Sequence, residues 1–101
     1  MKIGAIGVVE VSYFSNGVVV LDQMLKAANV SLLSWHQRLG GKMVHSVVTG
    51  SVSQVNASIQ AAKECDSIIG EGKVKVAVNI SNPHPEVIKL MNMLEEKLSE
   101  N

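Results

Sequence analysis

The sequence contains very little cysteine and few aromatic residues. Cys65 is the single cysteine among 101 residues, and there is one tryptophan, one tyrosine and one phenylalanine. A lone cysteine excludes a disulfide within the chain, and no cluster of cysteine and histidine has the spacing of zinc ligands. This cysteine usage is typical of a reducing compartment, so we expect a cytoplasmic protein.

The chain also lacks an excess of charge of either sign. Nine basic and nine acidic residues give a formal net charge of zero, which offers little attraction to nucleic acid or an anionic membrane. No apolar run reaches the roughly 20 residues that cross a bilayer, and the beginning of the chain has no signal-peptide pattern. We therefore expect a soluble protein without nucleic-acid or membrane partners.

Apolar residues make up 47% of the chain although aromatics make up only 3%. The core must then consist of Val, Ile, Leu, Met and Ala, and small β-branched residues suit a sheet covered by short helices. A small neutral chain with this much apolar surface has weak protection against association. The composition therefore fits a protein whose surface is partly consumed by self-association.

The order of apolar periods and turn signals predicts one domain over residues 1–101, with a core over about 3–90 and the end of the last helix and a tail over 91–101. Strands are expected at residues 3–11, 30–36, 43–49 and 73–80. Helices are expected after Ser15-Asn16-Gly17 to about Ala28, after the N-cap residue Ser51, and from about Pro85. The βαββαβ order is typical of a ferredoxin-like α+β fold, with a four-stranded antiparallel sheet, two helices on one face and an extra C-terminal helix.

Two apolar stripes should face the core. In the first helix the residues with helical spacing are Val18, Leu21, Leu25 and Ala28. In the last strand the alternating residues are Val74, Val76, Val78 and Ile80.

Nothing in the chain indicates catalysis. No ordering of Ser, His and Asp suggests a triad, and Gly4-x-x-Gly7 lies inside a predicted strand with no lysine after it, unlike a phosphate loop. Cys65, late in a helix, is expected to be a packing residue. His36 and His45 could face each other across a hairpin and bind a metal, or be buried or interface histidines; Trp35 could anchor an interface. We expect no enzyme activity and no cofactor.

Several segments, in order, resemble the BMC domain of bacterial microcompartment shell proteins. They are the first strand ending at Glu10, residues 22–30, the glycine pair Gly40-Gly41, the turns 50–52 and 70–72, and the dipeptide Pro83-His84. The resemblance covers residues 3–90. It implies a structural shell protein that forms flat cyclic hexamers, which tile into the shell of a microcompartment in the cytoplasm.

The resemblance also implies sites and partners. A pore on the sixfold axis would pass small polar metabolites, and other shell proteins and encapsulated enzymes would be the further partners. The pore-lining residues would be Arg38, Leu39, Gly40, Gly41 and Lys42. The residues at the edge between hexamers would be Lys26, Asn29, Asn82, Pro83 and His84.

Two positions depart from the family pattern. Asn82 stands where members commonly carry an arginine that enters the neighbouring hexamer. Leu39 lies near a position where some members carry a cysteine that holds an iron–sulfur cluster, so no cluster is expected; it could form an apolar constriction or simply complete a turn. The alternative function is a small ferredoxin-like regulatory domain, ACT-like or PII-like, that binds a metabolite as a dimer or trimer.

Overall fold

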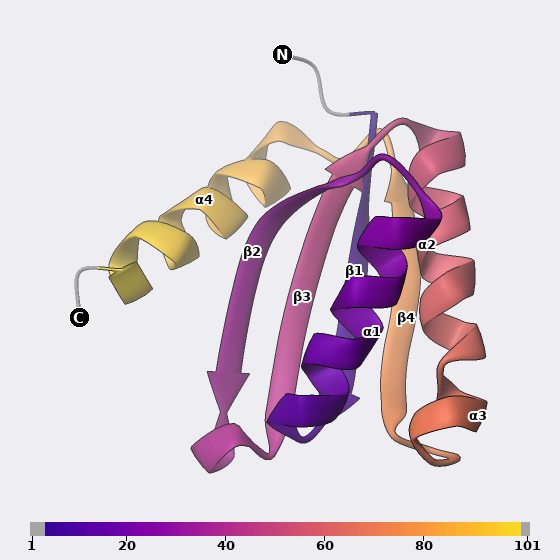
Figure 1. The fold of residues 1–101 in the computed structure, drawn as a ribbon. Coiled ribbons are helices and arrows are strands. Elements are labelled where there is room, and N and C mark those ends of the chain that lie inside the picture. Colours follow the sequence, from indigo (N-terminus) through magenta and orange to yellow (C-terminus); the bar gives the residue numbers. More distant parts are fainter. Residues whose placement is uncertain (1–3, 100–101) are drawn as a thin grey trace.

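The computed structural model describes residues 4–99 as one antiparallel sheet with helices on both faces (Figure 1). The strands are β1 (Ala5–Ser12), β2 (Ser31–Arg38), β3 (Met43–Gly50) and β4 (Val74–Ser81). The helices are α1 (Phe14–Ala27), η1 (Leu39–Gly41), α2 (Val52–Glu64), α3 (Asp66–Ile69) and α4 (Pro85–Ser99). The predicted first residue of β1, Ile3, and the predicted last two residues of the tail lie outside the described residues.

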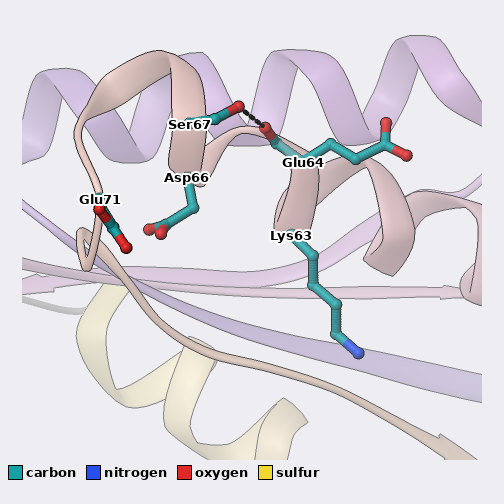
Figure 2. Close-up of a pocket in the computed structure, with 5 residues that line it drawn as sticks. All are labelled: Lys63, Glu64, Asp66, Ser67 and Glu71. Atoms are coloured by element: carbon teal, nitrogen blue, oxygen red, sulfur yellow. Dashed lines mark hydrogen bonds between the residues drawn. The ribbon is translucent and has the colours of Figure 1, made fainter.

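The sheet has the strand order β2-β3-β1-β4, and every neighbouring pair is antiparallel. This is the ferredoxin-like arrangement, and the fold prediction is confirmed. α1 and α2 cover one face, whereas α4 contacts β2 and lies on the other face, which we call the open face (Figures 1 and 2). β1 lies in the interior of the sheet, and β2 and β4 are its two edges.

The residues of α1 that face the core are not the ones predicted, because the buried face lies next to the predicted one on the helix. The buried residues are Gly17, Val20 and Met24, whereas Val18 and Leu25 are exposed. The reason is Gly17: a Cβ built there would lie 2.7 Å from Cβ of Val44, so only a glycine lets the helix come this close to β3. Leu21 and Ala28, also predicted to face the core, are partly buried against it.

The start of α1 also differs from the prediction. The helix begins at Phe14, ahead of the expected cap, and its N-cap residue is Tyr13 with φ 72° and no side-chain cap hydrogen bond. Asn16 lies in the first turn, where its side-chain amide donates to the Ser12 carbonyl over 3.0 Å. By contrast, Ser51 caps α2 as predicted and forms a capping box with Gln54.

A bulge corrects the prediction for β4. Val74 pairs with Val11, but the register shifts there, and Val76 pairs with Glu10. Since directly paired residues share a face and successive residues of β1 alternate, Val74 and Val76 lie on opposite faces of the sheet. Val74 packs against the core with Ala77, whereas Val78 and Ile80 are on the open face, 47% and 41% exposed. The last strand therefore presents apolar side chains to solvent, and only part of its predicted stripe faces the helices.

Candidate functional site

The connection between β2 and β3 is a tight turn built from left-handed residues. Leu39, Gly40 and Gly41 have φ of 55°, 64° and 87°. The two glycines have a positive φ, which glycine adopts without a steric penalty. Leu39 was not expected there, because a side chain makes this region unfavourable. The Lys42 N–H donates to the Leu39 carbonyl over 3.3 Å and closes the turn.

This turn is anchored to the start of α1. The Tyr13 N–H donates to the Lys42 carbonyl over 2.8 Å, and a Cβ built at Gly41 would lie 3.7 Å from Cβ of Phe14. Arg38 pairs with Met43 at the end of the hairpin. The predicted pore residues thus form one compact unit with contacts on two sides, and Leu39 at its tip is 73% exposed.

The other predicted group lies at the opposite end of the sheet. α1 ends there, close to Lys26 and Asn29, and so does β4, which precedes residues 82–84 (Figure 1). Lys26 is exposed and forms an ion pair with Asp22, with 2.8 Å between Nζ and Oδ2. The fold therefore brings these two segments to one end and separates them from the turn.

Residues 82–84 form a short link between β4 and α4. Asn82 has φ 48° and donates its N–H to the Gly4 carbonyl over 2.8 Å. Pro83 is buried, and Nδ1 of His84 accepts the Glu86 N–H over 3.1 Å. Asn82 suits this backbone because asparagine tolerates left-handed φ better than most residues.

An open hollow of about 460 Å³ lies beside α3 and is lined by charged and polar residues (Figure 2). Both carboxylate oxygens of Asp66 accept backbone N–H groups, of Gly72 and Val74, each over 2.9 Å. The Ser67 hydroxyl donates to the Glu64 carbonyl over 3.0 Å. The Lys63 side chain points away from Asp66 in Figure 2. Asp66 thus holds the loop that leads into β4, Ser67 bonds to the end of α2, and the lining residues form no nucleophile–base arrangement.

From the hydrogen bonds of Asp66 we predict that acid destabilises the loop that leads into β4. The N–H groups of Gly72 and then Val74 hold the pKa of Asp66 below its ordinary value. A lowered folded-state pKa contributes stability that is present above the unfolded pKa of about 3.9 and is lost as pH falls through the folded pKa. Asp66→Asn should therefore flatten the decline of melting temperature below about pH 4. Parallel declines in native protein and Asp66→Asn would contradict this role.

Other candidate chemistry is accounted for by packing and pairing. His36 faces His45 across the hairpin, as the sequence suggested, and His45 Nε2 lies 3.6 Å from Glu10 Oε1 on the next strand. Within residues 4–99, however, no group of three or more His, Cys, Asp or Glu could hold a metal ion. Cys65 packs in the core, and burial, followed by the nearby Glu64 carboxylate, raises the pKa of its thiol.

Sequence reasoning missed that the three aromatic residues lie close to the turn. The Phe14 and Trp35 rings meet edge to face, with 5.7 Å between their centroids, and Lys73 Nζ lies 5.2 Å from the centre of the Tyr13 ring. Tyr13 and Phe14 are adjacent in the chain, whereas Trp35 and Lys73 come from two other segments, so no local pattern could join them. Trp35 has a contact inside the chain, and its suggested role as an interface anchor stays a prediction.

Comparison with known proteins gives a consistent result. A family model described as BMC domain matches residues 5–83. The chain is 35% identical over 80 residues to the carboxysome shell protein CcmK2 of Synechocystis sp., covering 79% of this chain and 77% of that protein. It is 32% identical over 91 residues to the microcompartment shell protein PduA of Salmonella typhimurium, covering 90% and 94%.

A solved structure of a microcompartment protein from Desulfitobacterium hafniense superposes with a TM-score of 0.74 at 28% identity. The match covers 92% of this chain and 48% of that longer chain. In the part of the chain described here, no helix is both long and apolar enough to span a membrane.

Proposed function

This chain belongs to the BMC domain family of microcompartment shell proteins, and from that premise we propose that it closes into a cyclic homohexamer with the 38–42 turn around a central pore. Such hexamers would tile, with other shell proteins, into a shell in the cytoplasm that encloses enzymes. The pore would pass small metabolites, and the role of the chain would be structural.

The observation that best supports a ring is a pair of unlike apolar surfaces. One set, which we call the α1/β2 surface, comprises exposed Phe14, Val18 and Leu25 of α1 and exposed Leu32 of the edge strand β2. The Phe14–Trp35 ring contact joins α1 to β2. The other, the β4 surface, consists of Val78 and Ile80 on the open face. β2 and β4 are opposite edges of the sheet, so in a ring the two surfaces would face different neighbours.

Two different surfaces favour head-to-tail association. A twofold dimer needs one self-complementary surface, whereas contacts between unlike surfaces repeat from copy to copy and make a ring when the rotation closes. This favours a shell ring over the alternative of a dimeric ACT-like regulator. It also gives a reason for the exposed stripe of α1, because its two apolar faces would serve the core and the neighbouring copy.

The charge of the turn supports a filtering role. Arg38 and Lys42 are both exposed and flank the tip of the turn. In six copies around one axis they would make a positive entrance that attracts anionic and polar solutes. The edge group at the other end of the sheet would then point outward, toward neighbouring hexamers.

Native mass spectrometry and negatively stained particles test the proposal. We expect a particle of six chain masses and sixfold rings with a central hole. A particle of two or three chain masses would support the regulatory alternative, and a monomer at high concentration would contradict self-association altogether.

Lys26→Ala tests the proposed edge. The Lys26–Asp22 pair is exposed, so its loss should cost the fold only about 0.3–0.5 kcal/mol. Hexamers should survive while ordered sheets become rarer on stained grids, and Lys63→Ala, which removes an exposed lysine elsewhere, should leave sheets unchanged. Dissociation of Lys26→Ala into monomers would show that Lys26 belongs to the contacts within the ring.

A further inference from the structure

The C-terminal helix α4 uses only part of its apolar surface within the chain. Val87, Ile88 and Met91 are half-buried on this helix, which contacts β2 from the open face. Leu90 and Met93 are 51% and 56% exposed, and we call them the outer strip of α4. In Figure 1 the helix runs toward β2, and its last turns lie beyond that edge of the sheet. The outer strip is therefore an apolar surface that its own sheet does not cover.

The open face of β4 is uncovered as well. Val78 and Ile80 lie there with 47% and 41% of their surface exposed. Because β3 and β1 separate β2 from β4, the two edge strands lie about 14 Å apart at a spacing of about 4.8 Å per strand. A helix with its side chains is about 10–12 Å wide, so the part of α4 that lies on β2 does not reach β4. A cover for Val78 and Ile80 would have to come from outside the chain.

The two uncovered surfaces lie on the same face of the sheet and at opposite edges. Phe14, Val18 and Leu25 of the α1/β2 surface belong to the helix on the other face, so they are on the wrong side to cover the open face of β4. A flat ring would turn the open faces of all its copies to one side, because one rotation repeats every contact. Where the β2 edge of one copy meets the β4 edge of the next, the element on the open face beside β2 is α4.

We infer that α4 is an arm between copies, whose outer strip packs on Val78 and Ile80 of the next copy in the ring. This rests on the proposed function, since it requires the head-to-tail contact of the β2 and β4 edges. The α1/β2 surface and the outer strip would then hold the neighbouring edge from the two faces of the sheet. Four apolar side chains that the single chain exposes would be removed from water at every contact, which favours ring closure.

The charges beside the two apolar surfaces are complementary. Lys89 is exposed and lies four residues before Met93, hence on the same side of α4. Glu10 lies on the open face, two residues along β1 from the partner of Val78, and its side chain is 35% exposed although it lies near His45. Packing of Met93 on Val78 would bring the Lys89 ammonium toward the Glu10 carboxylate of the next copy. This match favours a second copy of the chain as the occupant of the β4 open face.

The first experiment asks whether α4 reaches the β4 strand of another copy. A Met93→Cys chain is co-expressed with an Ile80→Cys chain that carries an affinity tag, and the assembled protein is treated with a short bifunctional maleimide. Cross-linked pairs of one tagged and one untagged chain are expected on a denaturing gel. Cys65 is buried, so native protein supplies a low background. Leu32→Cys in place of Ile80→Cys is the matched control, because Leu32 is exposed on the opposite edge strand, and it should give no mixed pairs.

The possible failures of this experiment are distinguishable. Intact hexamers without mixed pairs would overturn the arm, leave the ring standing and assign the β4 open face to another molecule. Cross-links inside a chain that carries both Met93→Cys and Ile80→Cys, without any between chains, would show that α4 covers its own β4 and would overturn the arm too. Native protein that forms no hexamer would overturn the proposed function and this inference with it.

The second experiment measures what the arm contributes to the ring. Hexamers of native protein, Met93→Asp and the control Asn92→Asp are diluted, and mass photometry gives the concentration at which half of each has dissociated. Both residues are exposed in the single chain, so both variants should keep the fold, which circular dichroism checks. For Met93→Asp this concentration should rise at least about tenfold, whereas Asn92→Asp, on another side of the helix, should match native protein. Equal values for all three proteins would overturn the arm and leave the proposed hexamer standing.

Discussion

Gly17→Ala is expected to lower the free energy of unfolding by about 1–3 kcal/mol. A Cβ at position 17 would lie 2.7, 2.8 and 3.0 Å from Cβ, Cγ1 and Cγ2 of Val44, which is fully buried on β3. These atoms belong to a short branched side chain and cannot swing away, so helix and sheet must separate. Alanine favours a helix over glycine by about 1 kcal/mol, which reduces the loss but does not reverse it.

A double-mutant cycle with Val44→Ala isolates this contact. Val44→Ala alone leaves a cavity under α1 and destabilises the fold. In the double variant the methyl group added at position 17 no longer meets Cγ1 and Cγ2 at 2.8 and 3.0 Å, while Cβ of residue 44 stays at 2.7 Å. Two of the three close contacts are removed, so we expect a favourable coupling energy of about 0.5–3 kcal/mol from urea unfolding. Ser15→Ala, on the exposed part of the same helix, should change stability little. Additive effects at positions 17 and 44 would contradict the close packing of α1 on β3.

Leu32→Asp and Ile80→Asp are each expected to convert the proposed hexamer to monomers. Leu32 belongs to the α1/β2 surface and Ile80 to the β4 surface, and their exposure of 46% and 41% in the single chain lets the monomer keep its fold. In a ring each aspartate would be buried without a partner, which costs about 3–5 kcal/mol at every contact. Native mass spectrometry measures the result, with circular dichroism as the check on folding.

Mixing the two variants tests the head-to-tail arrangement directly. Each variant keeps one intact surface, so a Leu32→Asp chain and an Ile80→Asp chain can form one normal contact and no more. We expect dimers in the mixture and monomers in each variant alone. Ile68→Asp is the control, since Ile68 is 71% exposed on α3, outside both surfaces. Persistent hexamers in either single variant would remove the corresponding surface from the proposed interface.

The failures of sequence reasoning have a common cause. The periodicity identified α1 and β4 as elements but misassigned part of their faces, because both carry apolar residues beyond those the core uses. In α1 the decisive residue was Gly17. A pattern of apolar side chains does not count glycine, so it did not place Gly17 on the inner face of the helix. In β4 a one-residue bulge placed Val74 and Val76 on opposite faces, and a bulge depends on the partner strand β1.

The sequence by itself determined the order of the four strands and of α1, α2 and α4, the cap at Ser51 and the family, because each depends on local preferences or on residues in a fixed order. It did not predict the short helices η1 and α3. Only the tertiary structure decided which apolar residues stay outside the core. It also decided that the turn and the edge residues lie at opposite ends of the sheet, and that Leu39 carries an unfavourable backbone at an exposed tip. These features arise from the packing of segments that are distant in the chain. Local sequence preferences depend only on neighbouring residues, so they do not predict which distant segments come into contact.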